Sequence, residues 1–123
     1  MRYQFTLPWP PSTNRIWRNV VSRGKPQTLL SVEGRKFRAL AAQHCLVARV
    51  AGKRLTGRLA VELVAMPSDR RARDLDNVLK ATLDALTHAG VWVDDSQIDR
   101  LVVTRGEVMK EGRLVVCIEG VGE

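Results

Sequence analysis

The sequence predicts an α+β fold in which a mixed sheet of about four strands carries two helices on one face. Two stretches repeat apolar residues at helical spacing, and four short stretches have the apolar patterning of strands. In chain order these elements read β-α-β-α-β-β, and the simplest packing for that order places both helices on the same side of the sheet. The length of 123 residues suits a single domain spanning residues 1–123.

The first half of the chain predicts a strand, a long loop and a helix. Residues 3–7 alternate apolar and polar side chains, which is typical of a strand with one exposed face, and a run of prolines ends it. Residues 12–27 are polar and basic without a regular period, so we expect a long loop there. Ser31 is a suitable N-cap, and apolar residues then recur at helical spacing as far as Gly52.

The second half predicts a buried strand, a second helix and two further strands. Residues 59–66 are a short apolar run closed by a proline, which indicates a buried strand. The second helix begins near Asp74, carries a stripe of leucines and ends at Gly90, where we expect left-handed backbone. Residues 98–105 and 114–119 are separated by turn-forming residues, so we expect these two strands to pair as a hairpin.

The distribution of charge says more than its total. The net charge is +7, but residues 1–58 carry +11 and the remainder carries −4. An enzyme that acts on a nucleic-acid backbone needs cations for the phosphates and acids for a divalent metal. The basic first half and the acidic second half fit these two requirements. The alternative is that the charges intermix on the folded surface.

Composition excludes several classes of protein. Hydrophobic residues make up 45% and charged residues 27%, which is ordinary globular usage and fits neither a disordered chain nor a membrane protein. No apolar run approaches the roughly 20 residues that cross a bilayer, and the N-terminus lacks a signal-peptide pattern, so we expect a cytoplasmic protein. Cys45 and Cys117 lie in apolar runs without a CxxC partner, which predicts reduced, buried thiols.

The densest cluster of chemically active side chains combines three arginines with the acids and polar residues that follow them. Its members are Arg70, Arg71, Arg73, Asp74, Asp76, Asn77, Lys80, Asp94 and Asp95. Mg²⁺, or Mn²⁺ as a substitute, prefers carboxylate oxygens and keeps several waters, so two or three aspartates leave positions open for a phosphate and an attacking water. The arginines are unnecessary for helix capping and suit a substrate phosphate.

Simple geometry allows the two groups of aspartates to meet. A helix over residues 76–89 would be about 20 Å long, and an extended segment 90–95 would return by about 17 Å. Such a return would bring Asp94 or Asp95 close to Asp74 and Asp76. Because side chains alternate along an extended segment, only one of the two later aspartates is expected to point into the site.

Each of these residues also has an ordinary structural explanation. Asp74 suits a helix N-cap, and Asp76 suits the first turn, where the helix dipole favours an acid. Lys80 has Asp76 and Asp84 one turn away on either side as ion-pair partners. The two later aspartates suit a solvated turn, and the two histidines sit where a structural role is more common than catalysis.

Four segments together carry a specific pattern. They are residues 7–14 (LPWPPSTN), 31–34 (SVEG), 73–77 (RDLDN) with Lys80, and 84–95 (DALTHAGVWVDD). In this order and spacing the sequence resembles the RusA-type Holliday junction resolvases, which are small endonucleases of bacteria and their phages. The resemblance covers nearly the whole chain and adds to the reading of the individual residues.

The resemblance implies a homodimeric, Mg²⁺-dependent, structure-selective nuclease with a two-layer α+β sandwich fold. It implies cutting of four-way DNA junctions by symmetric paired nicks in recombination and repair, with no membrane partner and no small-molecule cofactor. By position, Asp74, Asp76 and Asp95 match the family's metal-binding carboxylates and Asp94 matches a supporting acid. Lys80 matches the family's functionally important lysine.

Hydrolysis of a DNA phosphodiester by water is therefore the leading hypothesis, with Lys80 positioning the scissile phosphate or stabilising developing charge. The expected DNA contacts are Arg15, Arg18, Arg23, Lys25, Arg70, Arg71, Arg73 and Asn77. Trp17 is expected either to stack at the junction or to join the core. The alternative is a non-catalytic basic nucleic-acid-binding module, and a third hypothesis keeps the metal site but assigns it to RNA or a smaller phosphoester.

Overall fold

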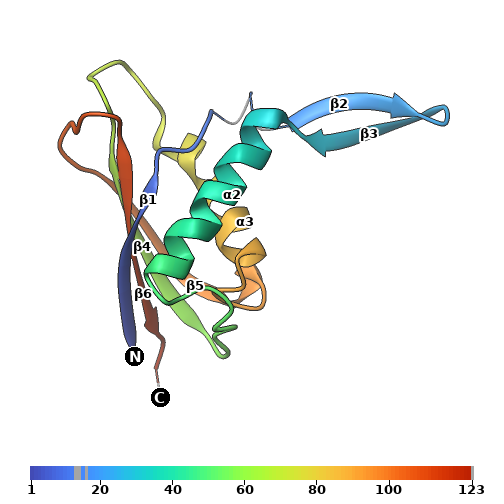
Figure 1. Cartoon of the computed structure of the whole chain (residues 1–123). Coiled ribbons are helices and arrows are strands. Elements are labelled where there is room, and N and C mark those ends of the chain that lie inside the picture. The colour runs from blue at the N-terminus through green and yellow to red at the C-terminus, as the bar shows by residue number, and fades with distance from the viewer. Residues whose placement is uncertain (13–14, 16, 123) are drawn as a thin grey trace.

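The computed structural model describes residues 1–12, 15 and 17–122, and Figure 1 shows how their helices and strands are arranged. In chain order these are β1 (Arg2–Pro8), β2 (Trp17–Ser22), β3 (Lys25–Leu30), α2 (Val32–Val47), β4 (Leu59–Met66), the 3-10 helix η1 (Leu75–Val78), α3 (Leu79–His88), the 3-10 helix η2 (Asp95–Gln97), β5 (Ile98–Arg105) and β6 (Arg113–Gly120). The predicted α+β fold, with a four-stranded mixed sheet, is confirmed.

One face of the main sheet and both helices share the core. The strand order is β1-β6-β4-β5, in which β4 runs parallel to β5 and antiparallel to β6. Alternate residues of β4 are buried on one face, namely Leu59, Val61, Leu63 and Ala65. They join Phe37 and Ala41 of α2 and Leu86 of α3 in a single cluster. Both helices therefore cover the same side of the sheet, as Figure 1 shows.

The predicted hairpin between the last two strands is wrong. β5 pairs with β4 in parallel, and β6 is inserted between β1 and β4. The burial of the two strands explains this order. β6 buries alternate residues completely, these being Leu114, Val116 and Ile118. β5 carries the exposed charges Asp99, Arg100 and Arg105, which suit a strand at the edge of a sheet.

The predicted long loop contains a second, two-stranded sheet. β2 and β3 pair antiparallel from Trp17↔Leu30 to Ser22↔Lys25, and they project from the body of the protein as a hairpin arm (residues 17–30). Arg23 and Gly24 form the turn with φ angles of 54° and 75°. Positive φ at both central residues is typical of the type I′ turn that best joins two twisted strands. The expectation of an irregular loop is therefore wrong over this range.

The ends of the helices follow the sequence in part. Ser31 caps α2 as predicted, and its Oγ accepts a hydrogen bond from the Gly34 backbone N–H at 3.0 Å. The helix ends at Val47 and not at Gly52, because Arg49 already takes left-handed backbone (φ 63°). Gly90 takes the predicted left-handed conformation (φ 75°) after α3.

Two further expectations concern the thiols and the membrane. Cys45 and Cys117 are both free. Cys45 is buried, and burial raises the pKa of its thiol to about 11. Cys117 is only half-buried, so the prediction of a buried thiol holds for Cys45 alone. Within the described ranges, no helix has the length and apolar character needed to span a membrane.

Candidate functional site

Asp74 and Asp76 lie where the loop after β4 enters η1, and both residues are exposed. Asp74 occupies the N-cap position of η1 with extended backbone (φ −84°, ψ 134°), but its side chain accepts no capping hydrogen bond. Neither carboxylate forms an ion pair within the described residues. The capping role considered above is therefore not what the Asp74 side chain does, and both carboxylates are open to a ligand.

A pocket beside Asp74 joins η1 to the proline-rich segment that follows β1. Its lining consists of Trp9, Pro10, Pro11, Ser12, Arg73, Asp74, Asn77 and Val78. The prolines make this wall stiff, because each ring fixes its own φ angle. The backbone N–H of Asn77 donates to the carbonyl oxygen of Asp74 at 3.2 Å. One turn of η1 thus brings an amide and a carboxylate to the same pocket.

Arg73 fixes the loop that leads into Asp74. Its guanidinium lies 2.7 Å from a carboxylate oxygen of Asp69, and it also donates to the Asp69 carbonyl oxygen at 3.0 Å. The same guanidinium lies over the ring of Trp9, 5.9 Å from its centroid, within the range of a cation–π contact. The Arg73 side chain is only 21% exposed. These contacts give Arg73 a structural role in holding the loop before Asp74.

The other two arginines of this loop are exposed. Arg71 pairs with Asp69 at 3.1 Å, but its side chain remains 80% exposed. The backbone N–H of Arg71, followed by the side chain of Arg73 and the charges of both arginines, holds the pKa of Asp69 below its ordinary value. Arg70 and Arg71 also line a pocket that includes Arg105. Three guanidinium groups thus lie around the end of β5 and the loop before η1.

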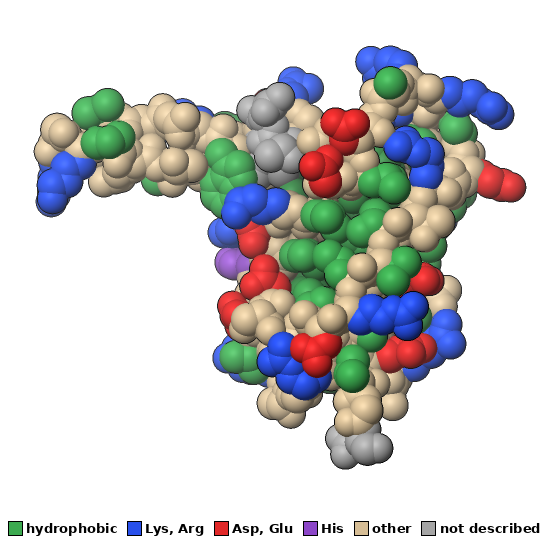
Figure 2. Space-filling view, turned by 180° about the vertical axis from the view of Figure 1, so that it is seen from behind, with side chains coloured by type: hydrophobic (Ala, Val, Ile, Leu, Met, Phe, Trp, Pro, Cys, Tyr) green, Lys and Arg blue, Asp and Glu red, His purple; other side chains and the backbone are tan. Residues whose placement is uncertain are grey.

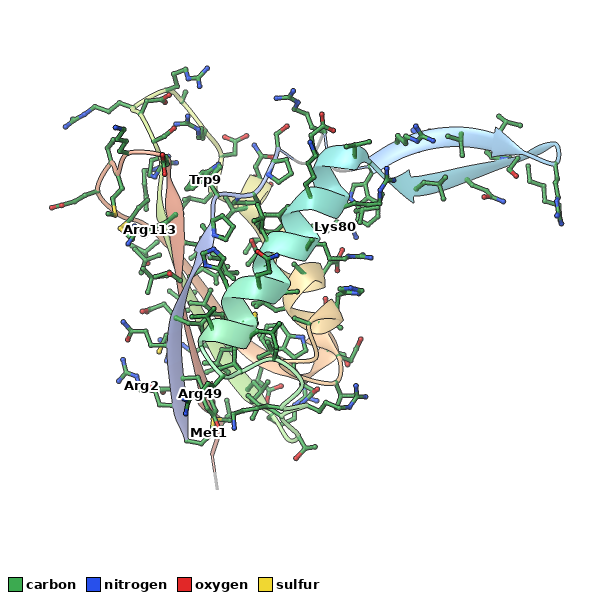
Figure 3. All side chains as sticks on the ribbon, in the orientation of Figure 1. Met1, Arg2, Trp9, Arg49, Lys80 and Arg113 are labelled. Atoms are coloured by element: carbon green, nitrogen blue, oxygen red, sulfur yellow. The ribbon has the colours of Figure 1, made fainter. Side chains whose placement is uncertain are left out.

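Lys80 lies in the first turn of α3 and is exposed. In the part of the chain that the structure describes, it forms no ion pair with Asp76 or Asp84. Its Nζ lies instead over the indole of Trp17, 5.4 Å from the ring centroid. Figure 3 shows Lys80 at the root of the hairpin arm. The ion-pair alternative for this lysine is therefore not the arrangement found.

Asp94 and Asp95 introduce η2, and their side chains differ in what they do. Asp94 caps η2, because its Oδ2 accepts from the Ser96 backbone N–H at 3.1 Å and the Gln97 Oε1 accepts from the Asp94 N–H at 2.9 Å. Hydrogen bonds from Ser96, first its side chain and then its backbone, lower the pKa of Asp94. Asp95 is exposed, and its carboxylate has no partner among the described residues.

The two groups of aspartates lie at opposite ends of β5. Asp95 precedes the strand, whereas the Arg105 guanidinium at its far end donates to the Arg73 carbonyl oxygen at 2.6 Å. Eight residues of strand span about 25 Å. Consistently, no group of three or more metal-ligating side chains gathers within the described residues. The predicted meeting of Asp74 and Asp76 with the later aspartates inside one chain is therefore wrong.

The reason lies in the segment that follows Gly90. The Trp92 indole N–H donates to the Thr87 hydroxyl at 2.6 Å, and Trp92 pairs with Leu55 in an isolated bridge. Gln97 Nε2 then donates to the carbonyl oxygens of Leu55 and Gly57, each at 2.9 Å. These contacts hold the segment at the C-terminal end of α3, so it does not return along the helix.

Three basic residues of the N-terminal half lie on the hairpin arm. Arg18 lies on β2, Arg23 in the turn and Lys25 at the start of β3, and all three are exposed. Arg15 is exposed at the root of the arm. Residues 15–30 contain no acid, and Figure 2 shows basic side chains at the tip of the arm. The arm therefore carries an uncompensated positive charge.

Comparison with known proteins identifies the family. The family of the endodeoxyribonuclease RusA matches residues 8–119. The chain belongs to the RusA family. The crossover junction endodeoxyribonuclease RusA of Escherichia coli K12 is 43% identical to this RusA-family chain over 121 residues, which covers 98% of this chain and 96% of that protein. The corresponding proteins of enterobacteria phages 82 and HK97 are 41% identical over 124 residues and 42% identical over 117 residues.

Several contacts of the RusA-family chain were not expected from its sequence. The stacking of Arg73 on Trp9 joins two segments more than 60 residues apart, so no pattern among neighbouring residues in the sequence predicts it. The cap at Asp94 did have a signal, because an aspartate followed by a glutamine three residues later has the spacing of a capping box. The range that matches the family includes both groups of aspartates, Lys80 and the hairpin arm.

Proposed function

We propose that this RusA-family protein is a structure-selective endonuclease that resolves four-way DNA junctions by paired, symmetric, Mg²⁺-dependent hydrolysis of phosphodiesters. The supporting observation is a division among its acids. Asp69 and Asp94 are engaged by their own loops. Asp74, Asp76 and Asp95 are exposed, and no partner holds their carboxylates within the described residues. These three acids are the ones to which the resemblance described above assigns metal binding.

The chemistry of these side chains suits a hard divalent cation. Asp74, Asp76 and Asp95 would hold Mg²⁺, or Mn²⁺ in its place, with Asp94 supporting Asp95 through the cap of η2. When bound, the metal would polarise the scissile phosphate and make water a better nucleophile near neutral pH. Lys80 would position the phosphate or stabilise the charge that develops on it.

A homodimer would supply what one chain lacks. Because Asp95 precedes β5 whereas Asp74 and Asp76 lie near its far end, and the strand itself spans about 25 Å, a complete set of ligands requires a second chain in which the strand runs the opposite way. A two-fold axis produces this arrangement twice, and it gives two equivalent sites for two equivalent DNA strands. Paired symmetric nicks follow from that symmetry.

The edge of β5 is the surface that fits a second copy. Leu101 of β5 is 38% exposed, whereas Val61, its neighbour on β4, is 1% exposed. In the view of Figure 2, hydrophobic side chains gather in the middle of the body and acidic groups lie above and below them. Placing a second copy on this apolar strip would bring the two groups of aspartates together across the interface.

DNA would be held on both sides of this site. The hairpin arm presents Arg18, Arg23 and Lys25, and a two-stranded β ribbon has the width that a major groove admits. Arg15 would add a backbone contact at the root of the arm. Nearer the cut, Arg70, Arg71 and Asn77 would contact phosphates, whereas Arg73 would act mainly by holding the loop before Asp74.

Cleavage of a synthetic junction tests the proposal directly. A mobile four-way junction and a linear duplex of the same sequence are incubated with the protein, in Mg²⁺ or in EDTA, and nicks are mapped on every strand. We expect paired symmetric nicks on the junction alone and with metal alone. Tight binding without cleavage in Mg²⁺ and Mn²⁺ would contradict the proposal and support the non-catalytic binding module.

A further inference from the structure

The root of the hairpin arm is a fixed joint. Ser31 Oγ donates to the carbonyl oxygen of Arg15 and accepts from the Gly34 N–H, so one hydroxyl joins both ends of the arm to the start of α2. The Arg35 guanidinium donates to the Leu30 carbonyl oxygen at 2.9 Å. Movement of the arm is therefore restrained where it meets the body.

Trp17 packs against the body at the root of the arm, as Leu30 does. It opens β2, pairs with Leu30 across the hairpin and belongs to the partly buried shell of the core. Its ring lines a pocket between the helices, together with Phe37 of α2 and Ala81 and Ala85 of α3. Its Nε1 is buried and has no hydrogen-bond partner in the described chain. The indole is thus held by packing, and its nitrogen contributes no bond there.

The Lys80 ammonium lies over the face of the Trp17 ring. Its Nζ lies 5.4 Å from the ring centroid, and a cation within about 6 Å of a tryptophan ring is attracted by the ring quadrupole. A lysine side chain has many rotamers and loses that freedom only where a partner holds it. The carboxylates one turn away form no ion pair with it among the described residues, so the ring is the contact that orients Lys80.

We infer that Trp17 is a positioning residue for Lys80 and couples the hairpin arm to the site of cleavage. This inference rests on the proposed function, in which Lys80 acts on the scissile phosphate. Because Trp17 is both the first residue of the arm and the support of Lys80, DNA held by the arm would meet the lysine at a fixed offset. Trp17 is then neither a wedge at the junction nor only a core residue.

Two substitutions separate positioning from packing. Trp17→Phe keeps an aromatic face and omits an N–H that has no partner, whereas Trp17→Leu keeps apolar bulk but removes the face. We expect Trp17→Leu to bind the junction within about twofold of wild type and to lower the single-turnover cleavage rate by about fivefold. Trp17→Phe should restore most of that rate. Circular dichroism and thermal melting check that both variants are folded.

A double-mutant cycle tests whether the effect passes through Lys80. In a Lys80→Ala background, Trp17→Leu should have little further effect on the residual rate. If Trp17→Leu lowers cleavage equally with and without Lys80, or if Trp17→Phe is as slow as Trp17→Leu, the positioning role is overturned. Equal rates for all three residues at position 17 would overturn it as well.

A spectroscopic measurement tests the contact without any nuclease activity. The protein is labelled with 5-fluorotryptophan, and the ¹⁹F resonance of Trp17 is assigned by its loss in Trp17→Phe. Lys80→Met should shift this resonance and leave those of Trp9 and Trp92 in place. An unmoved Trp17 resonance overturns the inference. A shifted resonance in a protein that cleaves no junction would support the contact and contradict the proposed function, so the two failures can be told apart.

Discussion

The guanidinium of Arg105 donates a hydrogen bond to the carbonyl oxygen of Arg73 at 2.6 Å. This contact ties the end of the edge strand β5 to the loop that carries Asp74. Arg73 in turn spans from Asp69 to the ring of Trp9. Three segments that are distant in sequence thus meet at Arg73, the residue immediately before Asp74.

Arg73 and Arg71 provide a matched pair for testing this arrangement. Arg73→Ala removes the ion pair with Asp69 and the stacking on Trp9, so we expect a loss of about 1–2 kcal/mol in the free energy of unfolding. Arg71→Ala should cost less than about 0.5 kcal/mol, because its ion pair is exposed to solvent. Urea denaturation measures both, and equal losses would rule out a special role for Arg73.

Asp76→Asn should abolish cleavage of a four-way junction, with a loss of at least about 10³-fold in rate, because an amide cannot replace a metal-binding carboxylate. Junction binding in Ca²⁺ or EDTA should stay within about threefold of wild type, since the DNA contacts remain. Glu62→Gln is the control, because Glu62 is an exposed acid on β4 outside the site. Near wild-type cleavage by Asp76→Asn would refute the site assignment.

Mixing two inactive variants tests whether each site is shared between chains. If Asp76 of one chain works with Asp95 of the partner subunit, a heterodimer of Asp76→Asn and Asp95→Asn chains contains one site with both changes and one intact site. A refolded equimolar mixture should then nick single strands at about a quarter of the wild-type rate, without paired cuts. Sites built within single chains would leave the mixture inactive.

Neutralising the hairpin arm should weaken DNA binding in a salt-dependent manner. In the triple variant Arg18→Gln, Arg23→Gln and Lys25→Gln, the slope of log K against log salt should decrease in magnitude by about 3, because each phosphate contact contributes about 0.9. The control neutralises Arg49, Lys53 and Arg54 after α2; Figure 3 shows Arg49 at the end of the body away from the arm. An unchanged slope in the arm variant would exclude phosphate contacts there.

The cap at Asp94 should make the free energy of unfolding depend on pH. Its pKa is lower in the folded protein than its ordinary value, so the stabilisation is full above about pH 5 and is lost as pH falls through the lowered pKa. Asp94→Ala should therefore be less stable than wild type at pH 7, and the difference should shrink below about pH 4. Urea midpoints at pH 7, 5 and 3 measure it; a difference that does not change with pH would contradict the cap.

Local patterns predicted the elements whose information is local. The apolar run that became β4, the cap at Ser31 and the left-handed Gly90 were all readable from a few neighbouring residues. The place of β6 between β1 and β4 was not readable, because it depends on pairing across most of the chain. The hairpin arm was missed because its turn places an arginine at positive φ, where asparagine or aspartate is the usual signal.

The acidic site shows a different limit of sequence reasoning. The residue types around Asp74 and Asp76 predict a metal site, which stays a prediction, whereas the predicted meeting with Asp95 rested on segment lengths alone. Those lengths permitted a return along α3, whereas Gln97 and Trp92 fasten the segment at the other end of the helix. The length of the segment after Gly90 limits how far it can extend, whereas its hydrogen bonds determine which end of α3 it lies against.

Because the arm is attached to the body near Ser31, the length of its two strands beyond that point can change without a change in the body. Since β2 and β3 pair with each other, and the arm meets the body at Arg15 and Ser31, one residue added to each strand near the turn would lengthen the arm by about 3.4 Å without touching η1 or α3. Each such step also turns the tip side chains to the opposite face. If the arm contacts DNA as proposed, this contact would therefore change in length and in side-chain presentation between related proteins, while the residues around Asp74 stay the same.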